Sequence, residues 1–151
     1  MKKLFSLFLC TLCLFISFKQ NAIANNSHLT LLKEMFKKVT LEKNDQAISL
    51  YYDKEFELYS NGQKMDFDTF LKMHRQIYKT SIQYKVRYDD KTFVEEGNRV
   101  AARLFITTKK PNQLAQEIEV ILIAEYKNEK LYRLWELTYP DWSKTKAFQI
   151  N

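Results

Sequence analysis

The sequence predicts an α+β fold in which three N-terminal helices cover one face of a curved, mainly antiparallel sheet. Two patterns lead to this prediction. Apolar residues recur at helical spacing in the first half of the chain, and from Ser81 onward they alternate with polar residues. Both glycines and both prolines fall at or beside the turns between these segments. A block of helices followed by a block of strands is the order of an α+β domain.

The chain begins with the pattern of a cleaved secretory signal. Two lysines precede an apolar run from Leu4 to Phe18, and small residues close the segment at Ala22 and Ala24. The run is shorter than the ~20 residues that a membrane-spanning helix needs. We therefore expect a signal peptide over residues 1–24 and a single domain over residues 25–151, with an uncleaved membrane anchor as the alternative. The mature protein would be exported to the periplasm or secreted, with no membrane attachment.

Composition limits the chemistry of the predicted mature chain. Both cysteines, Cys10 and Cys13, lie within the signal, so the remaining chain has no thiolate and no disulfide. The signal also takes three lysines and no acids, which lowers the net charge from +6 to +3. Because the remaining basic residues are interleaved with acids, we expect no nucleic-acid partner. We expect no metal site and no cofactor, since two histidines without cysteine do not suit zinc and no phosphate-binding loop is present.

Three helices are predicted in the first half of the chain. The first carries apolar residues from Leu29 to Val39 at helical spacing, and a second, shorter helix runs to Tyr51. The third has one apolar stripe from Phe70 to Tyr78. Each begins at a residue whose side chain can accept a hydrogen bond from the first turn. These predicted caps are Ser27, Asn44 or Asp45, and Asp66 or Asp68.

The strands are predicted by alternation and are bounded by turn residues. Asn61-Gly62 indicates a tight hairpin between two short strands, at about 55–60 and 63–66. Longer strands follow from residue 81, separated by turns near residues 89–90, 97–98, 109–112 and 127–129. The last strand covers residues 130–138 and is ended by Pro140.

Three pieces of the chain, in this order and spacing, resemble the nuclear transport factor 2-like superfamily and especially its SnoaL-like branch. They are the run YYDKEFEL at 51–58, the long hairpin after the third helix, and the closing run KLYRLWEL at 130–137. The resemblance covers about residues 28–142. It implies a cone-shaped fold, in which a strongly bent sheet wraps over three helices and leaves a cavity at its wide end. Members of the superfamily include isomerases, cyclases, dehydratases and binding modules, and dimers through the outer sheet face are common.

Glu136 is the first candidate for chemistry. If the last strand is phased with the strand before it, Tyr132 and Glu136 point inward while Trp135 and Leu137 point outward. A slip of one residue would reverse every side chain, and the two sets are equally apolar. An inward carboxyl group is partly desolvated, which raises its pKa and suits a general acid or base. The resemblance implies this role, because SnoaL-like cyclases place an acidic side chain in the cavity. A rim carboxylate paired with arginine and an outward surface charge are the alternatives.

His74 is the second candidate. It lies on the apolar stripe of the third helix, four residues after Phe70, whereas His28 lies near the N-terminus. His74 can face the cavity as a base or hydrogen-bond donor, or can pack as a boundary residue. Three tyrosines complete a lining that suits a small, partly apolar ligand with a polar group. They are Tyr52, Tyr84 and Tyr132.

Three functions remain open from the sequence. The first is an exported protein that binds a small ligand in its cavity. The second is a lyase or isomerase in which Glu136, with His74, acts as acid and base. The third is a protein-interaction module that uses an apolar patch on the outer sheet face, for which the resemblance implies a homodimer. The expected members of this patch are Phe105, Ile121, Ile123 and Trp135.

Overall fold

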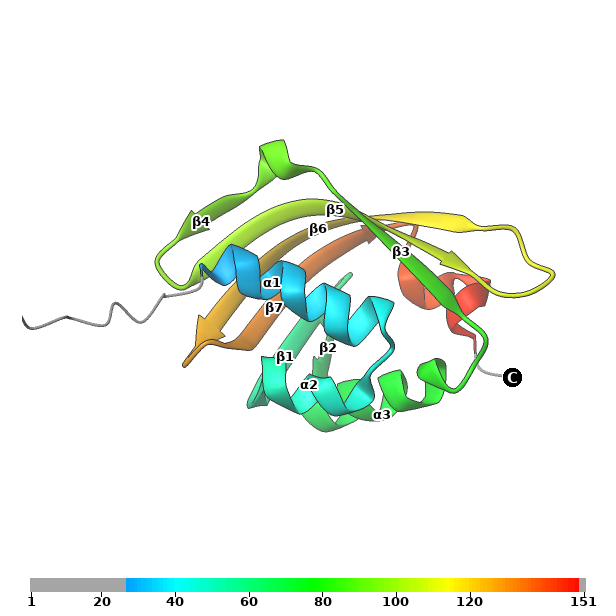
Figure 1. Cartoon of the computed structure of the whole chain (residues 1–151), viewed down its shortest axis with the longest axis horizontal. Coiled ribbons are helices and arrows are strands. Elements are labelled where there is room, and N and C mark those ends of the chain that lie inside the picture. The colour runs from blue at the N-terminus through cyan, green and yellow to red at the C-terminus, as the bar shows by residue number, and fades with distance from the viewer. Residues whose placement is uncertain (1–26, 150–151) are drawn as a thin grey trace, which may run out of the picture.

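Three helices lie on the concave side of one curved, seven-stranded sheet in the computed structural model (Figure 1). The structure describes residues 27–149. The predicted signal peptide, residues 1–24, and the predicted start of the domain at residue 25 lie outside the described residues. Within them, the predicted α+β fold with three helices on a strongly bent sheet is confirmed.

Each helix begins at a side-chain cap. Ser27 caps α1 (His28–Met35), Asn44 caps α2 (Asp45–Tyr51) and Asp66 caps α3 (Phe67–Tyr78). In each case the side-chain oxygen accepts a hydrogen bond from a backbone N–H of the first turn, which has no partner inside the helix. The predicted caps are confirmed, and the structure uses the first member of both alternative pairs.

The first helix changes its geometry after Met35. It continues into η1 (Phe36–Leu41), a π-helical turn in which the Glu42 N–H donates to the Lys37 carbonyl at 3.0 Å. Such turns hold an extra residue and are frequent at functional sites. The turn supplies two residues, Phe36 and Thr40, to the wall of an interior cavity.

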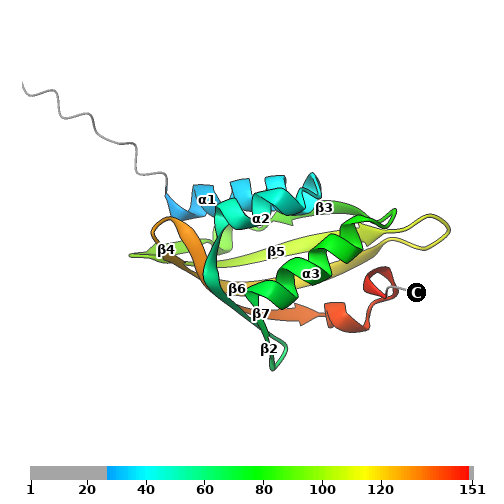
Figure 2. The ribbon, with the colours of Figure 1, turned by 90° about the horizontal axis from the view of Figure 1, so that it is seen from below.

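The sheet is mixed and unclosed, with strand order β2-β1-β7-β6-β5-β3. Neighbouring strands are antiparallel except β1 and β7, which run parallel. β4 pairs with β5 along the same edge as β3, after the short helix η2 (Asp90–Thr92). All three helices lie on one side of the sheet (Figure 2). The strands are β1 (Tyr52–Ser60), β2 (Gln63–Asp66), β3 (Gln83–Tyr88), β4 (Val94–Glu96), β5 (Arg99–Lys109), β6 (Gln116–Lys127) and β7 (Lys130–Tyr139).

The inner face of the sheet and the helices share one hydrophobic core. Alternate residues of β5 and β6 are buried against the helices, as the alternation predicts. After β7, the chain forms two short 3₁₀ helices, η3 (Trp142–Lys144) and η4 (Lys146–Phe148). Ala147 of η4 packs with Ile77 and Ile82 in a small second cluster, which fixes this C-terminal segment against the end of α3.

The predicted inward orientation of Tyr132 is wrong. Leu131 and Arg133 lie opposite consecutive residues of β6, so Tyr132 between them is the extra residue of a β-bulge. Its ring lies outside the cavity, 4.9 Å from the Lys127 ammonium nitrogen. The bulge shifts the alternation of β7, so that Leu131 is buried before it and Leu134, which is inward as predicted, is buried after it.

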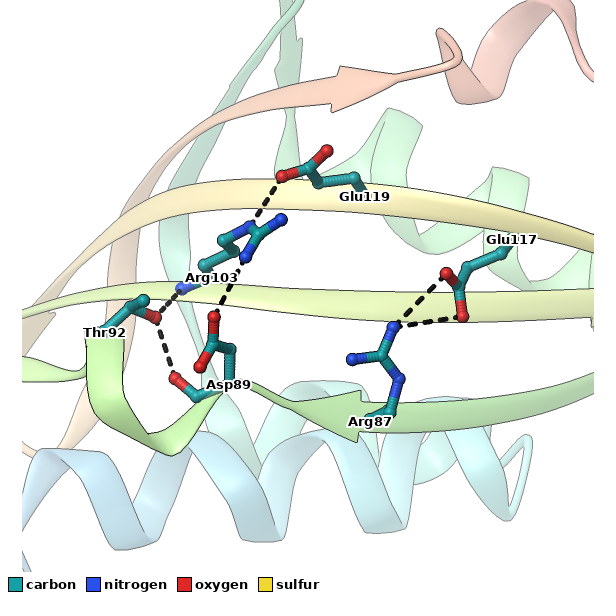
Figure 3. Close-up of polar contacts among 6 residues, drawn as sticks. All are labelled: Arg87, Asp89, Thr92, Arg103, Glu117 and Glu119. Atoms are coloured by element: carbon teal, nitrogen blue, oxygen red, sulfur yellow. Dashed lines mark hydrogen bonds and ion pairs between the residues drawn. The ribbon is translucent and has the colours of Figure 1, made fainter.

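The outer face over β3, β5 and the start of β6 carries a network of ion pairs, which we call the arginine network (Figure 3). Arg103 donates to two carboxylates at 3.0 and 2.6 Å, and Arg87 pairs with a third at 3.3 Å. The Phe105 ring lies 3.8 and 4.7 Å from the two guanidinium carbons. Phe105 is therefore covered by these arginines. The network consists of Arg87, Asp89, Arg103, Glu117 and Glu119.

The outer face over β6 and β7 is apolar. Three side chains here are exposed, Ile121 at 53%, Ile123 at 46% and Leu137 at 67%. Ile121 lies opposite Leu137, and Ile123 lies opposite Trp135, so these four residues form one outer apolar patch. The predicted outward direction of Ile121, Ile123 and Trp135 is confirmed, whereas Phe105 is covered by the arginines of the network and is not part of this patch.

Candidate ligand-binding cavity

A cavity of about 110 Å³ lies between the helices and the inner face of the sheet. Most of its lining is apolar, and it comes from α1, η1, α3, five strands and the C-terminal segment. An apolar cavity of ~150 Å³ accepts benzene, so this volume suits one ring or one compact head group. The lining side chains that can form hydrogen bonds are Thr40, Tyr52, His74, Tyr78, Tyr84, Glu136, Thr138 and Trp142.

Glu136 points into this cavity from β7, so its predicted inward phase is confirmed. The Ser60 hydroxyl of β1 donates to Glu136 Oε1 at 2.7 Å. Ser60 Oγ in turn accepts a hydrogen bond of 2.9 Å from the Trp142 indole N–H. An indole N–H can only donate, which leaves the Ser60 hydroxyl hydrogen free for an ionised Glu136. Three elements, β1, β7 and η3, thus fix the position of this carboxyl.

Burial controls the ionisation of Glu136. Desolvation raises the pKa of its carboxyl group. Hydrogen bonds from the side chains of Ser60 and Trp142 favour the charged form, and they oppose this increase only in part. The side chain keeps some exposed surface because it borders the cavity, although it lies deep among protein atoms. A carboxyl group with a raised pKa can act as a hydrogen-bond donor, a proton donor or a partner for a buried cation.

His74 borders the cavity from α3. Its Nδ1 lies 2.9 Å from the Phe70 carbonyl oxygen, which can only accept, so Nδ1 carries the hydrogen. Burial lowers the pKa of His74 to about 4, and the ring is therefore neutral at pH 7. In a neutral ring with hydrogen on Nδ1, the other nitrogen, Nε2, is an acceptor. This position of His74 agrees with the predicted cavity-facing alternative rather than with a boundary residue.

Aromatic rings form an almost continuous wall around the cavity. Successive ring centroids lie 4.0 to 6.3 Å apart, in the range of favourable aromatic contacts. The hydroxyl of Tyr78, one of these rings, is buried near Thr40 without a hydrogen bond of good geometry among the described residues. We call this wall the aromatic belt; it runs in order through Tyr52, Phe70, His74, Tyr78, Tyr84, Phe148 and Trp142.

Asn61 holds the C-terminal segment over one end of the cavity. It lies in the β1–β2 turn with φ of 49°. Its side-chain carbonyl accepts from the Thr138 N–H at 2.9 Å, and its amide donates to Thr138 Oγ1 at 2.7 Å and to Asp141 at 3.1 Å. The Trp142 N–H also donates to Thr138 Oγ1, at 3.2 Å. These bonds place the indole ring where it can close the aromatic belt.

Four of the five predicted site residues border the cavity. Glu136, His74, Tyr52 and Tyr84 are among its lining residues, and Tyr132 lies outside it because of the β-bulge. The catalytic and ligand-binding roles of the four stay predictions. Among residues 27–149, no three histidine, cysteine or acidic side chains gather closely enough to hold a metal ion. In the same residues, no helix has the length and apolar character needed to cross a membrane.

Sequence reasoning missed several members of the site, among them Phe148 in the cavity wall and Ser60, the hydrogen-bond partner of Glu136. Ser60 follows Phe56 and Leu58 at a spacing of two on β1, so the alternation of this strand indicates its inward direction. Phe148 has no comparable signal. It reaches the cavity only because two short 3₁₀ helices return the chain to the domain after Pro140.

Comparison with known proteins identifies the fold. No family model matches the sequence, and comparison with curated proteins gives no match. A SnoaL-like polyketide cyclase from Agrobacterium tumefaciens is similar with a TM-score of 0.59 and 13% identity, over 74% of this chain and 91% of that chain. PrhC from Penicillium brasilianum is similar with a TM-score of 0.63 and 11% identity, over 74% and 79% of the two chains. A de novo designed protein with a curved β-sheet has a TM-score of 0.56 and 21% identity, over 81% and 93%.

The described residues share the fold of these structures, which include a SnoaL-like polyketide cyclase, so the fold that the resemblance implies is confirmed. The fold and the cavity define a class of protein, namely a small cone-fold domain with an interior site. They do not define a reaction, because one fold supports many functions and a designed protein shares this one.

Proposed function

We propose that this is an exported protein that binds a small, partly apolar molecule in its cavity. The observation that carries the proposal is a carboxyl group, Glu136, and a neutral imidazole, His74, at the edge of an otherwise mainly apolar space. Buried polar groups normally have hydrogen-bond partners, and a ligand with one polar group would supply them here. Support for export comes from the two lysines, the apolar run and the small residues that begin the chain.

The size of the cavity limits the ligand. About 110 Å³ is enough for a single ring and too small for a molecule with several fused rings. Polyketide cyclases are among the similar structures, so cyclisation of a polyketide is one activity that the fold supports. The volume argues for a smaller ligand in this protein.

Binding is tested with the mature chain and single-ring compounds that carry a hydroxyl, amino or carbonyl group. Two-dimensional NMR spectra are expected to change at cavity-lining residues, and Val120→Phe, which fills part of the cavity wall, is expected to abolish the change. Val94→Phe adds the same bulk at a residue of β4 that is 61% exposed, and serves as the matched control. If every compound leaves the cavity signals unchanged, or if Val120→Phe binds like the wild type, the proposal is wrong.

Acid–base catalysis of the lyase or isomerase type is the second candidate. The raised pKa of Glu136 favours it, because a carboxyl group that titrates nearer to neutral pH exchanges protons more effectively. His74 fits this role less well. A pKa of about 4 makes its imidazole a hydrogen-bond acceptor and a weak base at pH 7. We therefore assign proton transfer to Glu136 and orientation of the ligand to His74.

Catalysis can be detected without knowledge of the substrate. Cyclohexanone in heavy water exchanges the hydrogens next to its carbonyl group slowly, and a general base in the cavity would accelerate this exchange. Proton NMR is expected to show faster exchange with the wild type than with Glu136→Gln, which keeps the size of the side chain. Equal rates for the two proteins would remove the enzymatic candidate and leave ligand binding intact.

We also propose a homodimer that buries the outer apolar patch. The supporting observation is that Ile121, Ile123 and Leu137 lie together on one face and are each about half exposed or more. Contiguous exposed apolar surface on a soluble domain commonly marks an interaction site. A two-fold symmetric contact would place each patch against its copy.

A further inference from the structure

We infer that the ligand is a small organic cation, an ammonium compound whose charged head lies in the aromatic belt against Glu136. The inference rests on the proposed function and adds the sign of the ligand's charge. Three observations carry it: one acidic side chain, a wall of aromatic rings, and no lysine or arginine among the cavity-lining side chains of residues 27–149.

Glu136 has no counter-charge among the described residues. None of the ion pairs among the described residues includes this carboxyl group, although twelve pairs occur elsewhere. The side chains that form hydrogen bonds at this carboxyl group are neutral, and the Ser60 hydroxyl donates to it at 2.7 Å. A buried carboxylate without a cation is costly, so a bound cation would stabilise the charged form of Glu136. An anionic ligand would meet the opposite situation, because no cationic side chain lines the cavity.

The aromatic belt has the chemistry of a site for cations. Rings attract cations over their faces, and compact quaternary ammonium groups are recognised by aromatic cages. Here Tyr84, Phe148 and Trp142 are linked by centroid distances of 6.3 and 5.5 Å at the end of the cavity formed by the C-terminal segment. Trp142 also contacts Ser60, the hydrogen-bond partner of Glu136, so aromatic rings and the carboxyl group belong to one connected structure.

The remaining titratable groups do not oppose a cation. Those that line the cavity with Glu136 are His74, Tyr52, Tyr78 and Tyr84. Burial lowers the pKa of His74 to about 4 and raises the pKa of each tyrosine, so all four are uncharged near pH 7. The unprotonated Nε2 of His74 can accept a hydrogen bond from an ammonium N–H or from a hydroxyl on the ligand.

Choline and its carbon analogue, dimethylbutanol, test the inference. The two molecules have the same shape, and only choline carries a charge. Isothermal titration calorimetry of the wild type at pH 7 and low salt is expected to give an affinity for choline about tenfold or more above that for the carbon analogue. Glu136→Gln is expected to remove the preference for choline.

Two further variants keep the test independent of folding defects in Glu136→Gln. Glu129→Gln removes the same charge from an exposed turn and is expected to retain the preference. Phe148→Leu keeps an apolar side chain but removes one ring of the aromatic belt, and is expected to weaken choline binding more than binding of the carbon analogue.

The outcomes separate the two proposals. If the carbon analogue binds as tightly as choline, or more tightly, the ligand is not a cation but the cavity still binds small molecules. If neither compound binds, and single-ring compounds also fail, the proposed function falls together with the inference. A choline preference that persists in Glu136→Gln would also overturn the inference, because another group would then be responsible.

Discussion

His74 and Glu136 border the same cavity, and burial affects their ionisation in opposite directions. Burial disfavours a charge on either side chain, so the pKa of His74 falls to about 4 while the pKa of Glu136 rises. The pH dependence of stability therefore has opposite signs for the two groups. His74 contributes stability that is present above its unfolded pKa and is lost as the pH falls. Glu136 contributes stability that is present at low pH and is lost as the pH rises through its raised pKa.

His74→Asn is expected to reduce the loss of stability in acid. Asparagine keeps a donor near the position of Nδ1 for the Phe70 carbonyl but does not titrate. Between pH 6.5 and 4 the unfolded wild type binds a proton on this imidazole that the folded state excludes, which lowers its free energy of unfolding by roughly 3 kcal/mol at most. Urea unfolding followed by tryptophan fluorescence at pH 7 and pH 4.5 measures the difference. If the free energies of unfolding of the two proteins fall equally between pH 7 and pH 4.5, the imidazole is protonated as easily in the folded state as in the unfolded state.

Where strand alternation is regular, the sequence correctly predicts which residues of a strand face the cavity. Glu136 is inward because β7 keeps its period of two from Leu134 to Thr138, and His74 follows from the helical spacing after Phe70. Tyr132 could not be placed, because a bulge depends on how two strands pair and not on the residue types of one strand. The lowered pKa of His74 was also beyond the sequence, since it depends on the depth of burial.

At the scale of the structural elements, the segment after β7 completes the wall of the cavity. The β1–β2 turn fixes the start of this segment through Asn61, whose side chain bonds twice to Thr138 at the end of β7 and once to Asp141. Turn residues and Pro140 show that the last strand ends, but they do not show that the chain then returns to the domain. The helices and strands themselves were predictable from capping residues and periodicity, and η1 and the C-terminal 3₁₀ helices were not.

Asn61→Gly is expected to loosen the C-terminal segment without disturbing the turn. Glycine accepts the positive φ of this position, so the substitution removes only the side-chain bonds. We expect a loss of about 1–2 kcal/mol in the free energy of unfolding and faster hydrogen exchange at residues 141–149.

Asn128→Gly is the matched control for this substitution. Asn128 has a similar φ of 52° in the β6–β7 turn, at the opposite end of β7 from the C-terminal segment. Hydrogen exchange measured by mass spectrometry compares the two variants. If exchange at residues 141–149 increases equally in both, or in neither, Asn61 does not hold this segment.

For the molecule as a whole, the two faces of the sheet have separate roles. The inner face holds the core and the cavity, whereas the outer face is divided between the arginine network and the outer apolar patch. The ion pairs of the arginine network limit how far an apolar contact on this face can extend. They therefore favour one defined arrangement of the partner over non-specific association.

Ile123→Lys is expected to convert the proposed homodimer to a monomer. The side chain is 46% exposed, so lysine should change the melting temperature of the monomer little, whereas a symmetric dimer would place each lysine against the partner's apolar surface. Sedimentation velocity at increasing protein concentration measures the change. Leu50→Lys, at a residue of α2 that is 70% exposed on the helical side, should leave the dimer intact. A wild type that sediments as a monomer at every concentration would refute the dimer.

The parallel pairing of β1 with β7 has a consequence for the time at which the protein can fold. β1 is an early strand, yet one of its two neighbours is the last strand of the sheet, and Ser60 meets Glu136 across 76 residues. A nascent chain therefore contains no cavity until β7 has been synthesised. Domains dominated by such distant contacts fold slowly compared with helical bundles. In the exported protein that we propose, the cavity would therefore stay incomplete until the last strand has crossed the membrane.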